Sequence, residues 1–560
     1  MKRTKRLFFL ALFAMLATAA TASALQREGF TPAKVNPEFI RYLEELESGK
    51  AEGRIPPKAY LSAQSADTSK HAAARAAALP ASFDLVSKGW VTGVKSQRSW
   101  GTCWDFATME TIESNLKKET GAEDELSELH LGFFAYYDES LEKPAYDATA
   151  KSGDNKIFDN GGTTYKARAI LTRGTGPVLD KDAPYPTVDA ADKAFWKNYP
   201  EDPEALKREL LAAPNAFRLK ESLSFHTSDD IKRALMEYGG LWIGFNANAV
   251  AENRQDPYIY TSADKTMNHA VMLVGWDDNL SRDLFVGPNA GYKSPDIDGG
   301  WKIQNSWGLS RDINEQEVTM GDDGYYWISY ADASIFGDIG ASSFIASADN
   351  WQHTYLHDPL GEVYGIDTPF TAVETANVFK AERNEDLVCV GFTTTGFDVD
   401  YGIQVYRNIP EDGEPDDGTP VFQTPQSGTA DFPGYRTVAL TSPVPLDRGE
   451  RFAVVVTLES DNSIEIPVEA AIDNFSSKAT AGAGESYVRT PDDDEWDEVR
   501  TYSDSYTDSN GKFHEVRCTN LTIKAFTNDA NRGSSGSNGC QTGAFALLFV
   551  ALIPIALRRR

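Results

Sequence analysis

Cysteine is scarce in this sequence, because only four of its 560 residues are cysteines. This low number excludes a disulfide-dense scaffold. Basic residues are also outnumbered: 54 Lys and Arg against 83 Asp and Glu give a formal net charge of −29. So acidic a chain is repelled by phosphate backbones, which argues against nucleic-acid binding. A mean hydropathy of −0.41 excludes a polytopic membrane protein. Hydrophobic residues make up 41% of the chain, which excludes a disordered chain, and the length favours more than one domain.

Long apolar runs occur only at the two ends of the chain. At the N-terminus, the basic stretch Met1–Arg6 precedes an apolar run, Leu7–Ala20, and the small residues of Ala22–Ala24. This order predicts a secretory signal peptide over residues 1–24, with a retained anchor helix as the alternative.

The C-terminal end has a comparable layout. A Ser/Gly/Asn-rich stretch leads to Cys540, an apolar run covers Ala544–Leu557, and three arginines close the chain. The run is shorter than the ~20 residues of a spanning helix, and the arginines are expected to stay cytoplasmic. The layout resembles bacterial C-terminal sorting signals of the Synergist type. The resemblance implies that residues 531–560 are a linker and a sorting or anchor segment, with Cys540 at the sorting site and membrane attachment before or after processing. An uncut, marginal membrane helix is the alternative.

Between the ends, the residue pattern changes twice. Residues 25–79 are polar, and their one clear helix opens at the N-cap pair Asn36-Pro37 and ends at Ser48-Gly49. Residues 80–349 mix helical and strand-like patterns. Residues 350–530 contain short apolar strands separated by turns, which is typical of an antiparallel β-sandwich.

The first stretch with candidate chemistry surrounds Cys103, which follows a glycine-containing loop and opens an apolar helical pattern. A thiolate at a helix N-terminus is stabilised by the helix dipole. Gln97, six residues earlier, carries a side-chain amide that would form an oxyanion hole together with the Cys103 backbone N–H. Taken alone, a single cysteine is more often a small buried apolar residue.

Two further stretches supply a candidate base and its partner. His269 opens an apolar strand that ends at Gly275-Trp276, and a strand holds an imidazole rigidly enough to pair with a thiolate. Asn305 ends another strand and is suited to accept the imidazole N–H. Trp307 follows and is expected to shield that hydrogen bond from water.

In this order, the residues Gln97, Cys103, His269 and Asn305 resemble those of the papain-like cysteine peptidases, the family that includes the cathepsins. The resemblance implies an α+β, two-lobed catalytic domain with a helical left lobe and a β-barrel-like right lobe. It also implies that Cys103 attacks a peptide carbonyl, that His269 exchanges the proton, and that an acyl-enzyme forms. No cofactor and no metal are implied, and the partners are peptide or protein substrates.

Further matches to this family extend from Leu79-Pro80, similar to a mature N-terminus, to the strand Gly324–Ser329. Gly161 and Gly162 resemble the pair whose backbone binds substrate. Two departures stand near Cys103. Trp100 replaces a cysteine of the family, and Asp105 replaces a small residue; a carboxylate there is expected to raise the pKa of the thiol.

The segment before the catalytic domain lacks the long two-helix pattern of many cathepsin propeptides. We expect the helix containing Phe39 and Leu46 to dock on the enzyme, and the segment Gly53–Leu61 to run through the cleft. Truncation of this segment would then change the activity.

The β-rich region opens at Trp351 and resembles the lectin-like domain that follows the catalytic domain in some surface peptidases. This resemblance implies binding of cell-surface glycan through exposed aromatic residues, for which the candidates are Tyr401, Tyr406, Tyr435 and Trp496. Core packing of these side chains is the alternative. Cys389 and Cys518 are candidates for a disulfide in an exported protein, with two buried thiols as the alternative.

Acidic loops at Gly321–Gly324 and at residues 411–417 do not match the spacing of an EF-hand, so we expect no metal site. We therefore expect an exported cysteine endopeptidase located at the cell surface, membrane-anchored, or secreted after tail processing. Two alternatives remain: a catalytically weak adhesin with a papain fold, and an acyl transferase or transpeptidase that uses the same thioester. The expected domains are residues 1–24, signal peptide; 25–79, propeptide and linker; 80–349, peptidase; 350–530, lectin-like β-sandwich; and 531–560, linker and sorting segment.

Overall fold

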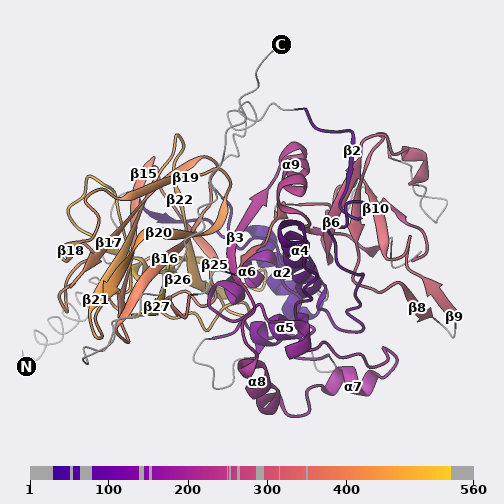
Figure 1. The fold of residues 1–560 in the computed structure, drawn as a ribbon, viewed down its shortest axis with the longest axis horizontal. Helices are drawn as coiled ribbons and strands as arrows, with labels where there is room; N and C mark the ends of the chain where they lie inside the picture. Colours follow the sequence, from indigo (N-terminus) through magenta and orange to yellow (C-terminus); the bar gives the residue numbers. More distant parts are fainter. Residues whose placement is uncertain are drawn as a thin grey trace, which may run out of the picture.

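The computed structural model consists of a mixed helical and β half and a second, β-rich half, which lie side by side (Figure 1). The structure describes residues 29–50, 54–62, 78–137, 144–150, 154–248, 250, 254–260, 265–285, 295–313, 316–337, 339–348 and 351–530. The expected signal peptide, and the tail with Cys540, lie outside these residues. Among the described residues, the helices lack the combined length and apolar character that crossing a bilayer requires.

The helical lobe is organised around α4 (Cys103–Thr120), which is buried along most of its length. It packs against α5 (Glu128–Tyr136) and α6 (Thr164–Thr172), which are capped by the side chains of Ser127 and Thr163. The remaining helical elements of the catalytic half are α7 (Lys193–Asn198), α8 (Pro203–Ala212), α9 (Ser228–Tyr238), η1 (Asp180–Asp182) and η2 (Arg282–Leu284).

The second lobe of the catalytic half is a largely antiparallel sheet that is packed against α4. Its central strand β6 (His269–Asp277) is buried along nearly its whole length and lies between β4 (Leu241–Phe245) and β7 (Gly300–Gln304). The other strands of this sheet are β2 (Ser82–Asp84), β3 (Arg218–Phe225), β5 (Tyr258–Ile259), β10 (Tyr325–Ser329), β11 (Ala341–Ser342) and β12 (Ile345–Ser347), whereas β8 (Ser310–Ile313) and β9 (Gln316–Thr319) form a separate two-stranded sheet. The strand that begins with His269 is thereby fixed on both edges.

The β-rich half contains long antiparallel strands with alternating burial. The strands are β13 (His353–Tyr355), β14 (Tyr364–Asp367), β15 (Ala372–Lys380), β16 (Glu385–Thr394), β17 (Val399–Arg407), β18 (Thr419–Pro420), β19 (Gln426–Ala430), β20 (Gly434–Leu446), β21 (Arg451–Glu459), β22 (Glu465–Ala471), β23 (Ser486–Arg489), β24 (Asp497–Glu498), β25 (Ser503–Thr507), β26 (Phe513–Leu521) and β27 (Lys524–Asp529). A short helix, η3 (Val499–Thr501), precedes β25. The expected α+β class is confirmed.

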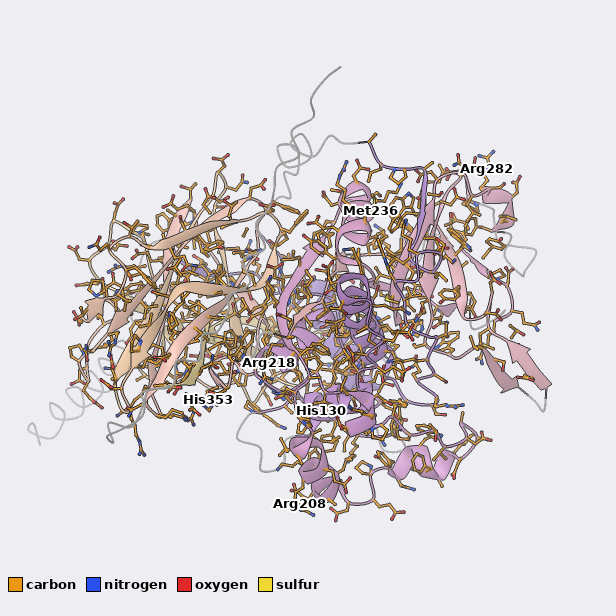
Figure 2. The ribbon with its side chains drawn as sticks, viewed as in Figure 1. His130, Arg208, Arg218, Met236, Arg282 and His353 are labelled. Atoms are coloured by element: carbon orange, nitrogen blue, oxygen red, sulfur yellow. The ribbon has the colours of Figure 1, made fainter. Side chains whose placement is uncertain are left out.

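One sheet runs through both halves of the molecule. Its described strands follow the order β13-β27-β16-β20-β3-β11-β4-β6-β7-β10-β5, so the pairing of β20 with β3 connects the two halves. Arg218, on β3, lies at the junction (Figure 2) and donates to the carbonyl of Trp351 over 3.3 Å. A hydrophobic cluster also extends from α4 into the β-rich half. The halves therefore share both hydrogen bonds and core.

The segment before the catalytic half packs on the β-rich half. Its helix α2 (Pro37–Ser48) is capped by Asn36, which accepts the Glu38 N–H over 3.0 Å, and it buries Phe39 against Phe475 with ring centroids 5.0 Å apart. A two-residue strand, β1 (Thr31–Pro32), pairs with β14 and becomes an edge strand of the five-stranded sheet. The helix was expected; its partner in the β-rich half was not.

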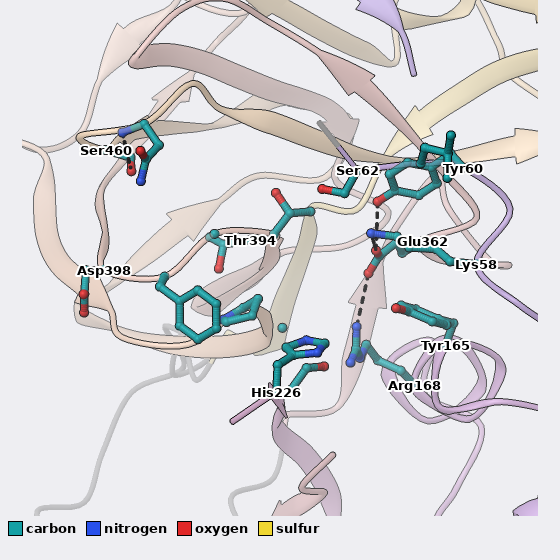
Figure 3. Close-up of a pocket in the computed structure, with 18 of the residues that line it drawn as sticks. Lys58, Tyr60, Ser62, Tyr165, Arg168, His226, Glu362, Thr394, Asp398 and Ser460 are labelled. Atoms are coloured by element: carbon teal, nitrogen blue, oxygen red, sulfur yellow. Dashed lines mark hydrogen bonds and ion pairs between the residues drawn. The ribbon is translucent and has the colours of Figure 1, made fainter. Parts of the chain in front are cut away.

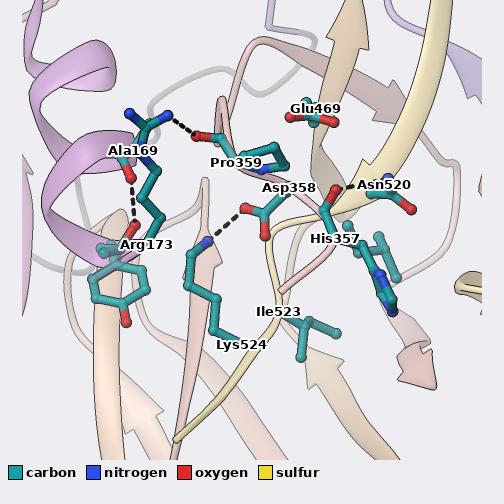
Figure 4. Close-up of polar contacts among 12 residues, drawn as sticks. Ala169, Arg173, His357, Asp358, Pro359, Glu469, Asn520, Ile523 and Lys524 are labelled. Atoms are coloured by element: carbon teal, nitrogen blue, oxygen red, sulfur yellow. Dashed lines mark hydrogen bonds and ion pairs between the residues drawn. The ribbon is translucent and has the colours of Figure 1, made fainter. Parts of the chain in front are cut away.

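A buried ion pair of the β-rich half lies close to the catalytic half. The Lys524 ammonium lies 2.5 Å from Asp358, and both side chains are almost fully buried. Close by, the Arg173 guanidinium donates to the carbonyls of Pro144 over 2.7 Å and Pro359 over 3.3 Å (Figure 4). Arg173 of the catalytic half and Lys524 of the β-rich half thus bind adjacent residues, Pro359 and Asp358, near the start of the β-rich half.

The candidate disulfide is not formed. Cys389 and Cys518, both within the described residues, lie on β16 and β26, strands of two different sheets, and no disulfide joins them. Two of the aromatic residues expected to be exposed are also buried: Tyr435 and Trp496 are 1% and 7% exposed. The expected aromatic surface was wrong for these two positions. Tyr435 lies on β20, between β16 and β3, whereas Trp496 lies in a loop, where the Arg489 guanidinium covers its ring at 4.2 Å and its indole N–H donates to Asp416 over 3.0 Å.

We predict that Lys524→Met destabilises the protein by about 3–5 kcal/mol, because the buried Asp358 carboxylate loses its partner. The double variant Lys524→Met, Asp358→Leu should recover most of this loss, while Lys380→Met, an exposed position on β15, should change little. Urea denaturation of the full chain measures all three. A double variant as unstable as the single one would contradict the account.

Candidate active site

Cys103 stands at the first position of α4, where the helix meets the sheet. Its half-buried thiol accepts a hydrogen bond from the backbone N–H of Ala270, the second residue of β6. The preceding residue on β6 is His269. The packing of α4 against β6 therefore brings the candidate nucleophile and the candidate base, 166 positions apart in the numbering, to the same point.

The His269 ring is held on two sides. Its Nε2 lies 2.8 Å from Oδ1 of Asn305, so Nδ1 is the ring nitrogen that remains for the thiol. The Trp307 ring packs on the imidazole with centroids 4.9 Å apart. Asn305 is in turn fixed by its backbone N–H, which donates to the carbonyl of Gly324 over 3.0 Å. This arrangement fixes the orientation of the imidazole and covers it.

Gln97 is anchored by both atoms of its side-chain amide. Nε2 donates to the carbonyl of Trp100 over 2.8 Å, and Oε1 accepts from the Ser306 hydroxyl over 2.8 Å. An amide NH₂ carries two hydrogens, so the second remains for an oxygen in the cleft. The bond to Ser306, next to Asn305, links Gln97 to the loop that orients His269.

Gly161 and Gly162 form one wall of the cleft. Gly161 has a φ of +63°, and a Cβ on Gly162 would approach Trp104 to 2.2 Å, so glycine is required at both positions for steric reasons. The Gly161 carbonyl accepts from the Tyr136 hydroxyl over 2.5 Å.

Of the expected segment Gly53–Leu61, the residues Arg54 and Ile55 lie in the cleft. The Ile55 N–H donates to the carbonyl of Met267 over 3.0 Å, on the His269 side. On the other wall, the Arg54 carbonyl is the nearest atom to a Cβ built on Gly161, at 3.9 Å. Ile55 is 6% exposed. The chain itself therefore lies where an extended substrate would lie.

Burial sets the ionisation of the pair in this state. It raises the pKa of the Cys103 thiol to about 11, although the Ala270 N–H hydrogen bond opposes the shift. It lowers the pKa of His269 to about 4, although the hydrogen bond that the imidazole donates to Oδ1 of Asn305 opposes the shift. With the cleft filled, the neutral thiol and the neutral imidazole are therefore favoured.

The two departures near Cys103 have structural consequences. Trp100 is 2% exposed, stacks on Phe158 with centroids 4.3 Å apart, and donates its indole N–H to the Trp196 carbonyl over 2.6 Å. Aromatic packing thus fills the position of the missing cysteine. Asp105 is fully buried, and burial raises the pKa of its carboxyl well above the ordinary range. Burial therefore favours the neutral carboxyl, and the charge of Asp105 in its ionised form contributes to the raised pKa of the Cys103 thiol, as expected.

A charged cluster behind the site was missed from the sequence. The Lys95 ammonium lies 2.5 Å from Glu113 and 2.8 Å from Glu128. Glu113 also accepts from the Thr92 hydroxyl over 2.6 Å. The cluster ties the loop before Cys103 to α4 and α5. Glu113 stood in the sequence among other charged residues of the same helix, so it gave no distinct signal.

Comparison with known proteins agrees with this geometry. Residues 79–337 match the model of the papain family cysteine protease, and residues 354–527 match that of the lectin like domain. Residues 79–337 are a papain-family cysteine protease domain. The chain thus carries a papain-family cysteine protease domain followed by a lectin-like domain.

The curated relatives each match less than half of this chain. Cathepsin S of Bos taurus is 26% identical over 249 residues, 44% of this chain and 59% of its own length; cathepsin L2 of Homo sapiens is 27% identical over 234 residues, 41% of this chain and 57% of its own. The chain therefore spans somewhat over half the length of these curated relatives.

The solved structure of the cysteine protease and lectin-like domains of Cwp84, a surface layer associated protein of Clostridium difficile, shares the fold of both domains. It has a TM-score of 0.69 and 23% identity, over 90% of this chain and 99% of that one. A second Cwp84 structure, of a variant protein after propeptide cleavage, has a TM-score of 0.63 and 25% identity, over 80% of this chain and 99% of that one.

Within the described residues, no group of three or more His, Cys, Asp or Glu side chains is arranged to hold a metal ion.

We predict that filling of the cleft controls the pH dependence of Cys103 alkylation. In the chain that retains residues 29–62, the rate should rise towards a midpoint near the pKa of about 11, because the reacting species is the thiolate. After cleavage at a protease site introduced between residues 62 and 78, the midpoint should fall below ~8.5, the ordinary thiol value. Iodoacetamide labelling of Cys103, followed by mass spectrometry, gives both profiles, with buried Cys518 as the internal control. Identical midpoints would contradict the account.

Proposed function

We propose that this protein is an exported cysteine endopeptidase, made as a precursor, that hydrolyses peptide bonds through Cys103 and His269. The observation that supports this most strongly is the contact of the Cys103 thiol with the start of β6, beside an imidazole held by Asn305. A nucleophile, a base and an orienting group are thereby arranged in sequence, as covalent catalysis requires.

The proposed reaction has two steps. His269 takes the thiol proton through Nδ1, and the Cys103 sulfur attacks the peptide carbonyl carbon. The oxyanion is stabilised by the Cys103 backbone N–H and the second amide hydrogen of Gln97. When the C–N bond breaks, His269 gives its proton to the leaving amine and a thioester remains. Water then attacks the thioester, His269 receives and returns a proton, and the acid product and the thiol are released.

Residues 29–62 are the proposed inhibitory prosegment. They fill the cleft through Arg54 and Ile55, and burial of the pair under them favours the uncharged thiol. The relative Cwp84 has a propeptide that is cleaved. Removal of the segment would open the cleft and allow the thiolate–imidazolium pair to form.

Export is supported by the signal-like residues 1–24 and by the surface layer association of Cwp84. We further propose that residues 531–560 are a linker and a sorting or anchor tail, which would attach the protein to the membrane before or after processing at Cys540. Binding of cell-surface glycan by the lectin-like domain is retained as part of the proposal. Tyr401 and Tyr406, both half-buried, are the remaining aromatic candidates from the original four.

We predict that a peptidyl epoxide labels Cys103 stoichiometrically after the prosegment is removed, and that the intact chain is labelled slowly. Cys103→Ala should abolish both the labelling and the cleavage of casein. Cys389→Ala, which removes a thiol of the lectin-like domain, should retain both. The readouts are the mass of the labelled protein and the release of casein fragments.

Absence of labelling in the folded, cut protein would contradict the proposed peptidase and leave the papain-fold adhesin. Product masses separate the remaining alternative. If the main products carry an added amine supplied in the assay, the thioester is used for acyl transfer and not for hydrolysis.

A further inference from the structure

The prosegment continues from the cleft onto the lectin-like domain, where Lys58 enters a group of carboxylates. The Lys58 ammonium lies 3.8 Å from Glu362 and 3.6 Å from Glu465. Two residues later, the Tyr60 hydroxyl donates to Glu362 over 3.2 Å (Figure 3) and to Glu465 over 3.0 Å. Lys58 and Tyr60 belong to the prosegment, whereas both glutamates remain after it is removed.

The carboxylates are arranged so that they require a cation. Glu465 and Asp367 stand directly opposite each other on β22 and β14, and like charges at such positions repel. Glu465 is 2% exposed. Its Oε2 and the Oδ1 of Asp367 have no hydrogen-bond partner among the described residues. Burial and the charge of Glu465 raise the pKa of Asp367 to about 6.

Arg168 does not replace Lys58. Its guanidinium lies 3.2 Å from the other oxygen of Glu362, which leaves Glu465 and Asp367 to Lys58. With Lys58 present, three carboxylates face two cations. Without it, they face one, and the buried Glu465 and the half-buried Asp367, on neighbouring strands, lose their counter-charge. This loss of counter-charge favours the binding of another cationic side chain, as long as that of Lys58, in its place.

The carboxylate group is continuous with the cleft. Only Pro56 and Pro57 separate Lys58 from Ile55, and they pass over the start of α6, where Thr163 and Tyr165 line the path. Three residues of extended chain span ~10 Å. A cavity of about 370 Å³ adjoins Lys58, Tyr60, Arg168 and Glu362. A peptide lying in the cleft therefore reaches this group without a turn.

We propose that, once the prosegment has left, Glu362, Glu465 and Asp367 form an extended subsite for a Lys or Arg side chain of a substrate whose backbone lies in the cleft. This rests on the proposed peptidase function. The lectin-like domain then contributes directly to substrate selection, through a basic residue three positions from the one that takes the place of Ile55. We name these three side chains the acidic subsite.

The test uses the full chain after removal of the prosegment, with internally quenched peptides. Long peptides carry Lys or norleucine three positions from the residue in the place of Ile55, on either side, and short peptides end before this position. We expect kcat/KM to be roughly tenfold higher for Lys than for norleucine in one of the two long series, as for a desolvated charge pair. Comparison of Lys with norleucine keeps the length of the side chain and removes its charge.

Glu465→Gln should reduce this Lys-to-norleucine ratio to near one. Glu382→Gln, an exposed carboxylate of the same domain, should retain it. Equal rates for Lys and norleucine in the unaltered enzyme, or an unchanged ratio in Glu465→Gln, would overturn the proposal.

Failure of the peptidase function is distinguishable, because short and long peptides would then all stay intact. In that case, binding decides the proposal. The cut Cys103→Ala protein should bind a labelled peptide of residues 54–62 about tenfold more tightly than the same peptide with norleucine in place of Lys58. Equal binding would overturn the acidic subsite independently of catalysis.

Discussion

The hydrogen bond from the Ala270 N–H to the Cys103 sulfur is the contact on which the rest of the site depends. It forms where the first residue of a buried helix meets the second residue of a buried strand. The strand is fixed by neighbours on both edges, so His269 has a defined place beside the thiol. Asn305 and Trp307 fix the imidazole directly, by a hydrogen bond and by ring packing. Gln97 contacts the loop that carries Asn305, through its bond to Ser306. The reactivity of the Cys103–His269 pair therefore depends on the packing of α4, in the helical lobe, against β6, in the second lobe.

The second constraint is the prosegment, which both domains hold at once. Its Arg54-Ile55 pair lies between Gly161 and Met267, while Lys58 and Tyr60 are held by the lectin-like domain. The same segment therefore fills the cleft and places a cation beside the carboxylates of the paired strands β14 and β22. Because one sheet also connects the domains through β20 and β3, the lectin-like domain is positioned as a part of the cleft's surroundings. Loss of the prosegment therefore changes the charge environment of the Cys103–His269 pair and that of the carboxylates beside Lys58 at the same time.

Much of the site could be predicted from local sequence, because each element has its own signal. The N-cap at Asn36 indicates the helix before the catalytic domain, and the apolar runs after Cys103 and His269 indicate a helix and a strand at the right places. The contacts between distant residues carry no such signal. Burial of Tyr435, Trp496 and Asp105, and the separation of Cys389 from Cys518, depend on which elements pack against each other in the folded chain. The approach of Lys58 to Glu465 joins positions 407 apart in the numbering, and neither residue alone indicates the other.

The central claim is that the filled cleft keeps the Cys103–His269 pair uncharged and that opening it permits the ion pair. NMR of a histidine-labelled chain tests this at His269, assigned with a His269→Gln sample. At pH 8, above the ordinary histidine pKa of ~6.5, the account predicts a neutral imidazole in the intact chain, in line with its pKa of about 4. It predicts a protonated imidazole after prosegment removal, and a neutral one again in the cut Cys103→Ala protein, where no thiolate is present. A neutral imidazole in both the intact and the cut chain that retain Cys103 would contradict the account.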